Sequence, residues 1–138
     1  TYYPGWGNLL IKITEKTLPD LAVTSLSDPP GEKSRNGTFT VTDTVTNIGE
    51  VWASSSITRF YLSADTRLDA GDVLLTGYRL VGGLSPGASS SGSTRVTIPK
   101  TAPRGVFYLL ACADGTGSVL ERDEWNNCAA AARTIRVR

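Results

Sequence analysis

Hydrophobic and polar residues alternate along this chain in short stretches that suit β-strands. The stretch Thr38–Thr46 shows this best, because threonine fills every second position and Phe39, Val41 and Val45 lie between. A period of two places the threonines on one face of a strand and the apolar side chains on the other. No stretch combines capping residues with the 3.6-residue apolar stripe of a helix. The pattern therefore predicts an all-β protein.

Eight segments of the chain are expected to be strands. Glycine, proline, serine and asparagine cluster between them, as expected of turns. Many short strands separated by turn residues are typical of an antiparallel β-sandwich. The eight segments are Leu9–Thr14, Asp20–Leu26, Thr38–Thr46, Ser56–Ser63, Val73–Val81, Ser93–Ile98, Val106–Ala113 and Ala129–Val137.

Asp43 breaks the alternation of Thr38–Thr46, because it falls on the apolar side. Two explanations are open for this residue. It lies near an end of the sheet, or a β-bulge turns it outward to solvent.

The chain has two cysteines, Cys112 and Cys128. Cys112 lies near the end of one predicted strand and Cys128 directly before the next, with turn residues between them. Consecutive strands usually pair antiparallel, which brings the two sulfurs within bridging distance. We expect a disulfide, with two buried free thiols as the alternative. A disulfide indicates an oxidising compartment, which is the periplasm, the cell surface or the outside of the cell. Of these we expect an extracellular or cell-surface location.

Composition excludes several classes of function. The 138 residues suit one domain, and the 14 basic and 13 acidic residues nearly cancel, so we expect no nucleic-acid partner. The chain contains no histidine, which excludes Ser–His and Cys–His nucleophile pairs and any histidine-bound metal. No apolar run approaches the roughly 20 residues that cross a bilayer, so no membrane insertion is expected. We expect no enzyme activity.

Short motifs follow one another in a consistent order from residue 19 onward. They include Thr44-Val-Thr-Asn-Ile-Gly49, Phe60-Tyr-Leu-Ser-Ala-Asp65, Leu84-Ser-Pro-Gly87 and Val119-Leu-Glu-Arg-Asp-Glu-Trp-Asn-Asn127. This set resembles the CARDB family, the cell-adhesion-related domain found in bacteria and archaea. Two departures are Asp123, where the family usually has asparagine, and Trp125 at a variable position. The resemblance implies an immunoglobulin-like sandwich of about seven strands over residues 19–138, in a surface or secreted protein, with no catalysis of its own.

Three aspartates, Asp65, Asp69 and Asp72, gather in the segment between two predicted strands. Clustered carboxylates suit calcium, which takes several oxygen ligands from one loop. Their spacing does not match an EF-hand, and the alternative is that they bind backbone amides to hold an irregular loop. Calcium is the one cofactor considered.

Residues 1–18 lie outside the family resemblance and form an N-terminal extension that is rich in aromatic and apolar residues. Such a segment is expected to pack somewhere, either on its own sandwich or, as an added strand, on a neighbouring subunit. The second arrangement does not close, so it grows into a filament. We leave open whether the sequence is a mature protein or a piece of a longer one. The expected assembly residues are Tyr2, Tyr3, Trp6, Leu9, Leu10, Ile11 and Ile13.

These observations favour a structural or adhesive module outside the cell that binds proteins, copies of itself included. The alternative is a carbohydrate-binding or accessory module of a larger secreted protein. That role needs exposed aromatic side chains, for which Tyr61, Tyr78 and Trp125 are the candidates.

Overall fold

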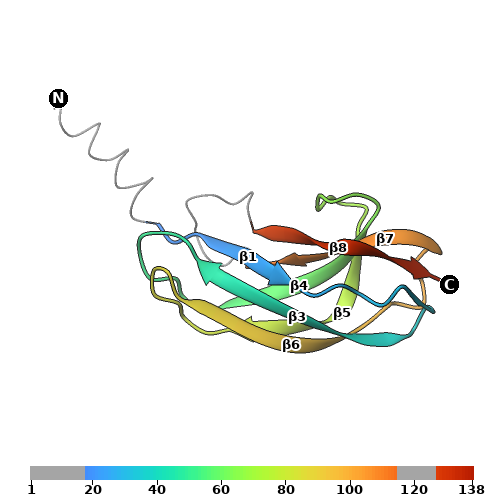
Figure 1. Ribbon diagram of the computed structural model, residues 1–138, viewed down its shortest axis with the longest axis horizontal. Helices are drawn as coiled ribbons and strands as arrows, with labels where there is room; N and C mark the ends of the chain where they lie inside the picture. Colours follow the sequence, from blue (N-terminus) through green and yellow to red (C-terminus); the bar gives the residue numbers. More distant parts are fainter. Residues whose placement is uncertain (1–17, 115–126) are drawn as a thin grey trace, which may run out of the picture.

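The computed structural model describes residues 18–114 and 127–138, and within these ranges the chain forms eight strands and no helix (Figure 1). The all-β prediction is therefore confirmed. No helix in these ranges is long and apolar enough to span a membrane. The strands are β1 (Leu21–Leu26), β2 (Glu32–Lys33), β3 (Thr38–Asn47), β4 (Ser56–Ser63), β5 (Val73–Val81), β6 (Ser89–Thr97), β7 (Gly105–Cys112) and β8 (Cys128–Val137).

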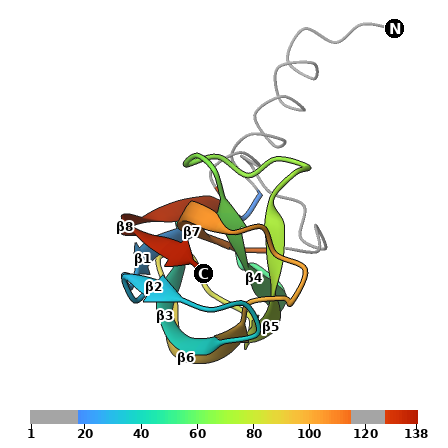
Figure 2. The same ribbon diagram turned by 90° about the vertical axis from the view of Figure 1, so that its right-hand side faces the viewer.

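The strands form two layers of one curled sheet, in the order β1-β3-β6-β5-β4-β7-β8-β2. One layer holds β1, β3 and β6, and the other holds β5, β4, β7, β8 and β2. Thr76 of β5 pairs with Thr97 of β6 and joins the layers on one side, while β1 and β8 contact each other on the other side. Figure 2, turned by 90°, shows the strands around a common centre. The predicted immunoglobulin-like sandwich is confirmed.

The core lies between the two layers and is made of alternate residues of the strands. This is the arrangement that the period of two predicts, and burial of each large apolar side chain contributes about 1.5–3 kcal/mol. The main buried side chains are Phe60, Leu62, Leu75, Leu109 and Ile135 from one layer and Leu21, Val41, Val45 and Val96 from the other.

Gly77 allows β5 to pass from one layer toward the other. Its φ of 113° is a backbone conformation that L side chains rarely adopt, and a Cβ there would lie 2.6 Å from the carbonyl oxygen of Arg95. The register between β4 and β5 shifts at this point, between Arg59 and Tyr61. Glycine at this bulge therefore keeps Tyr78 and the residues after it on the outer face of β5.

The structure departs from the predicted strands at two places. β6 begins at Ser89 rather than Ser93, and β2 is an additional two-residue strand that pairs parallel with β8, so the sheet is mixed rather than fully antiparallel. Every other pair of strands in the described ranges is antiparallel. The predicted strand Leu9–Thr14 lies outside the described residues, and the boundary between an extension of residues 1–18 and a domain of residues 19–138 stays a prediction.

Candidate binding surfaces

The predicted disulfide is confirmed between Cys112 and Cys128. The two residues are direct partners in the antiparallel register of β7 and β8, and their sulfurs are 2.05 Å apart. The described part of the chain contains no free cysteine. The bridge joins the end of one strand to the start of the next and fixes how they pair.

The aspartates between β4 and β5 accept hydrogen bonds within two separate turns. Asp65 Oδ1 accepts hydrogen bonds from the Arg67 amide at 3.0 Å and from Ser63 Oγ at 3.2 Å. Asp72 Oδ2 accepts one from the Asp69 amide at 3.0 Å. Within residues 18–114 and 127–138, no group of three or more histidine, cysteine, aspartate or glutamate side chains is placed to hold a metal ion. The contacts fit the alternative in which the carboxylates hold the loop, and calcium binding stays a prediction.

Asp69 carries a raised pKa, above its ordinary value of 3.8, and the main cause is the negative charge of Asp72. A raised pKa in the folded state means that this group stabilises the fold below its unfolded pKa, and that this contribution is lost as pH rises through the folded pKa. We expect Asp72→Asn to lower the pKa of Asp69 toward its ordinary value, because the repelling charge is removed. Titration of the side-chain carboxyl carbons by NMR measures this shift. An unchanged pKa would contradict the assignment of Asp72 as the cause.

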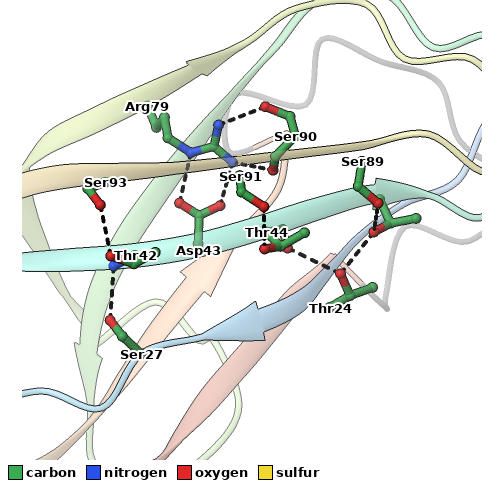
Figure 3. A network of polar contacts seen from close by, with 11 residues as sticks. Thr24, Ser27, Thr42, Asp43, Thr44, Arg79, Ser89, Ser90, Ser91 and Ser93 are labelled. Atoms are coloured by element: carbon green, nitrogen blue, oxygen red, sulfur yellow. Dashed lines mark hydrogen bonds and ion pairs between the residues drawn. The ribbon is translucent and has the colours of Figure 1, made fainter.

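The outer face of the β1–β3–β6 layer is covered with hydroxyl groups, as Figure 3 shows. The prediction that the threonines share one face of the strand is confirmed, since each threonine of β3 alternates with a buried residue. The hydroxyls form hydrogen bonds with one another across the strands, so part of their hydrogen-bonding capacity is already used on the surface itself. We call this surface the hydroxyl face. Its bonds join Thr42 to Ser93, Thr44 to Ser91 and Thr46 to Ser89 at 2.8, 2.7 and 2.8 Å, and Thr24 to Thr46 at 2.9 Å.

Asp43 lies in the interior, and both explanations proposed for it are wrong. It sits in the middle of β3 in an unbroken register with β6, and its side chain is completely buried. Arg79 of β5 binds both carboxylate oxygens, through Nε at 2.8 Å and Nη2 at 2.7 Å (Figure 3). A carboxylate can be buried here because bidentate, charge-assisted hydrogen bonds from Arg79 replace its hydration.

Two residues of β6 make this ion pair fit. Ser90 accepts hydrogen bonds from the Arg79 guanidinium on its hydroxyl and on its carbonyl oxygen, both at 2.9 Å. Gly92 lies directly opposite Asp43, and a Cβ there would lie 2.8 Å from Cδ of Arg79. The absent side chain therefore leaves the path along which Arg79 crosses β6 to reach Asp43.

The outer face of β4 and β5 is apolar and aromatic, in contrast to the hydroxyl face. Leu74, Tyr78 and Leu80 of β5 are 43%, 57% and 69% exposed. Each is paired in register with an outward residue of β4, and we call this surface the β4–β5 face. The pairs are Leu80 with Ile57, Tyr78 with Arg59 and Leu74 with Tyr61.

Tyr61 and Tyr78, two of the three aromatic candidates, thus share the β4–β5 face. Trp125, the third, lies outside the described residues, as do all the expected assembly residues of the N-terminal extension. Leu74 and Leu80 are not among the residues that the sequence singles out as candidates. The signal for them is the alternation of β5, which places them on the same side as Tyr78.

Comparison with protein families places the chain among known adhesion-related domains. A profile of the CARDB family matches residues 18–131. A comparison with curated proteins gives no match.

Solved structures of similar fold include two archaeal domains. The CARDB domain of a Pyrococcus furiosus protein, crystallised in complex with di-metal ions, is 22% identical, covers 89% of this chain and 91% of its own, and has a TM-score of 0.59. A domain from Methanosarcina acetivorans, from a protein named as a cell surface protein, is 20% identical over 88% of this chain and 93% of its own, with a TM-score of 0.58.

An enzyme also contains a region of this fold. A β-glucosidase from Erythrobacter marinus matches 87% of this chain at 14% identity and a TM-score of 0.55, but the match spans 16% of the enzyme. At these identities the likeness of all three structures shows the fold alone.

Proposed function

This chain belongs to the CARDB family of cell-adhesion-related β-sandwich modules, and from that premise we propose that it is a non-catalytic structural or adhesive module outside the cell. Family membership fixes the fold better than the ligand, so the finer role rests on the surfaces described above. The feature that supports binding rather than catalysis is the β4–β5 face, where apolar and aromatic side chains are exposed beside one another.

The location outside the cell is supported by the disulfide between Cys112 and Cys128. Disulfides persist in oxidising compartments and are rare in the cytosol. The family's association with cell adhesion agrees with display at the cell surface.

We propose further that the N-terminal extension joins copies of the chain head to tail. Its apolar and aromatic residues need a surface to cover them, and a contact between two different surfaces of one molecule does not close on itself. The family match begins at residue 18, so the extension is separate from the sandwich in sequence.

Removal of residues 1–17 is expected to abolish self-association, because the linking segment is lost while the described core stays intact. Light scattering coupled to size-exclusion chromatography measures the molar mass of the full chain and of residues 18–138 over a range of concentrations. We expect growing assemblies for the full chain and a monomer for the shortened one. Assemblies of equal size in both samples, or a monomeric full chain, would contradict the proposal.

A second candidate is carbohydrate binding, which the shared position of Tyr61 and Tyr78 on the β4–β5 face favours. Aromatic rings exposed on a sheet face suit stacking on sugar rings. Binding of the full chain to a glycan array tests this candidate, and loss of the signal in Tyr78→Ala would assign it to this face. Calcium binding at the aspartates between β4 and β5 stays a prediction, and no function is derived from it.

A further inference from the structure

The edges of the sheet are partly covered in the described part of the chain. β1 and β8, which lie toward the two ends of the strand order, contact each other. The C-terminal half of β8 is covered, because the Arg136 amide donates to the Gly31 carbonyl oxygen at 2.9 Å and the Arg138 amide donates to that of Lys33 at 3.0 Å. An outer face of the sheet is the other kind of surface on which a joining segment can lie.

The β4–β5 face is the apolar surface that is available. Of the large hydrophobic side chains that are exposed in the described residues, three lie in a row on β5. Trp52, which is 59% exposed, lies with its ring against Gly83, three residues beyond Leu80. Grouped apolar side chains of this kind mark interaction sites in soluble proteins. The hydroxyl face lacks such side chains.

Arg59 gives this face a positive charge at its middle. It pairs in register with Tyr78 on one side and with Cys112 on the other. Its Nε is buried and has no hydrogen-bond partner among the described residues. The Arg59 side chain is partly exposed, so its charge can attract a carboxylate that reaches this face. The partner expected here is an apolar segment with one acidic residue.

The N-terminal extension has this character in its sequence. Leu9, Ile11, Ile13 and Glu15 occupy every second position, so an extended segment would present three apolar side chains and one carboxylate on the same side. The described chain begins at Leu18, whose carbonyl oxygen lies beside Gly49, just after the end of β3. At roughly 3.3–3.6 Å per extended residue, Glu15 can lie up to roughly 10–11 Å from Leu18, and Leu9 up to roughly 30–32 Å.

We propose that Leu9–Glu15 of one copy lies on the β4–β5 face of the next copy, with Glu15 bound to Arg59. This inference rests on the proposed head-to-tail assembly and names its receiving surface. The apolar side chains of the segment pack on those of the β4–β5 face to one side of Arg59. The contact joins two different surfaces, so each added copy exposes a free β4–β5 face or a free N-terminal segment.

Exchange of the two charges tests this contact in the full chain. Arg59→Glu and Glu15→Arg are each expected to weaken self-association by at least about tenfold, because each leaves two like charges facing each other. The double variant restores the opposite charges and is expected to return to within about threefold of the natural chain. Light scattering over a concentration series gives the apparent dissociation constants. Arg95→Glu, a charge reversal on the hydroxyl face, is the matched control and is expected to leave assembly unchanged.

A neutral pair of variants, Tyr78→Ser and Leu80→Ser, removes apolar contact without adding charge and is expected to weaken assembly as well. Circular dichroism checks that each variant keeps the sheet. If removal of residues 1–17 abolishes assembly while the face variants and the charge reversals leave it unchanged, the proposed function stands and this inference is overturned. If removal of residues 1–17 changes nothing, the proposed function itself fails. Loss in both single charge variants without recovery in the double variant also overturns the pairing of Glu15 with Arg59.

Discussion

Arg79→Ala is expected to lower the free energy of unfolding by about 3–5 kcal/mol, the largest loss among single substitutions considered for this chain. The side chain of Asp43 is completely buried, and Arg79 binds both of its oxygens within 2.8 Å. Without Arg79 the carboxylate stays in the interior with no opposite charge, and Ser90 loses its contacts as well. Urea unfolding followed by circular dichroism gives the difference between the variant and the natural chain.

Two further variants separate charge from packing in this prediction. Arg95→Ala removes an exposed arginine that bonds to Thr38 at 3.1 Å, and its cost is expected to stay within about 0.5 kcal/mol. The double variant Asp43→Val with Arg79→Met replaces the ion pair by apolar side chains, and it is expected to recover most of the lost stability. An Arg79→Ala variant as stable as Arg95→Ala would show that the buried ion pair does not hold the two layers together.

Removal of the disulfide is expected to cost about 3 kcal/mol, because the bridge restricts the unfolded chain over a sequence separation of 16 residues. The variant Cys112→Ala with Cys128→Ala removes both sulfurs and leaves no free thiol among the described residues. Urea unfolding of the natural chain and of the variant measures the loss.

Reduction provides the control for this prediction. A reducing agent is expected to lower the stability of the natural chain by the same amount and to leave the double cysteine variant unchanged. A natural chain whose stability does not respond to reduction would contradict a stabilising bridge, and would also weaken the assignment to an oxidising compartment.

The alternation of residues predicts most of the strands because each has one buried and one exposed face. Thr38–Thr46 and Ser56–Ser63 agree with the structure to within one residue of β3 and β4. The start of β6 is missed, since Ser89, Ser90, Ser91 and Gly92 have the composition of a turn. They form a strand because their hydroxyls pair with the threonines of β3 and because Gly92 leaves space for Arg79. β2 is missed because two residues that pair with a distant strand leave no local pattern.

The buried ion pair shows what a single strand pattern cannot reveal. Asp43 and Arg79 are 36 positions apart, and each interrupts the inward positions of its own strand. A signal was present in the sequence, because two opposite charges each fall on the apolar side of a predicted strand. Each residue considered alone favours an end of a sheet or a bulge, and only the pairing of β3, β6 and β5 brings the two charges together.

The two outer surfaces of the sandwich differ in the side chains that they expose. Hydroxyls that already bond to one another cover one layer, while on the other Leu74, Tyr78 and Leu80 lie near Arg59, whose Nε has no hydrogen-bond partner among the described residues. A molecule with one apolar face and an apolar N-terminal segment has the two complementary surfaces that a growing assembly needs.

The most direct test of this account is a cross-linking measurement between two different variants of the full chain. Glu15→Cys and Arg59→Cys chains are mixed and oxidised, so that a new disulfide can form between an N-terminal segment and a β4–β5 face only from different molecules. We predict a cross-linked dimer of the two variants, detected by non-reducing electrophoresis and mass spectrometry, and little product when Arg95→Cys replaces Arg59→Cys. No cross-link with Arg59→Cys, or an equal yield with Arg95→Cys, would contradict it.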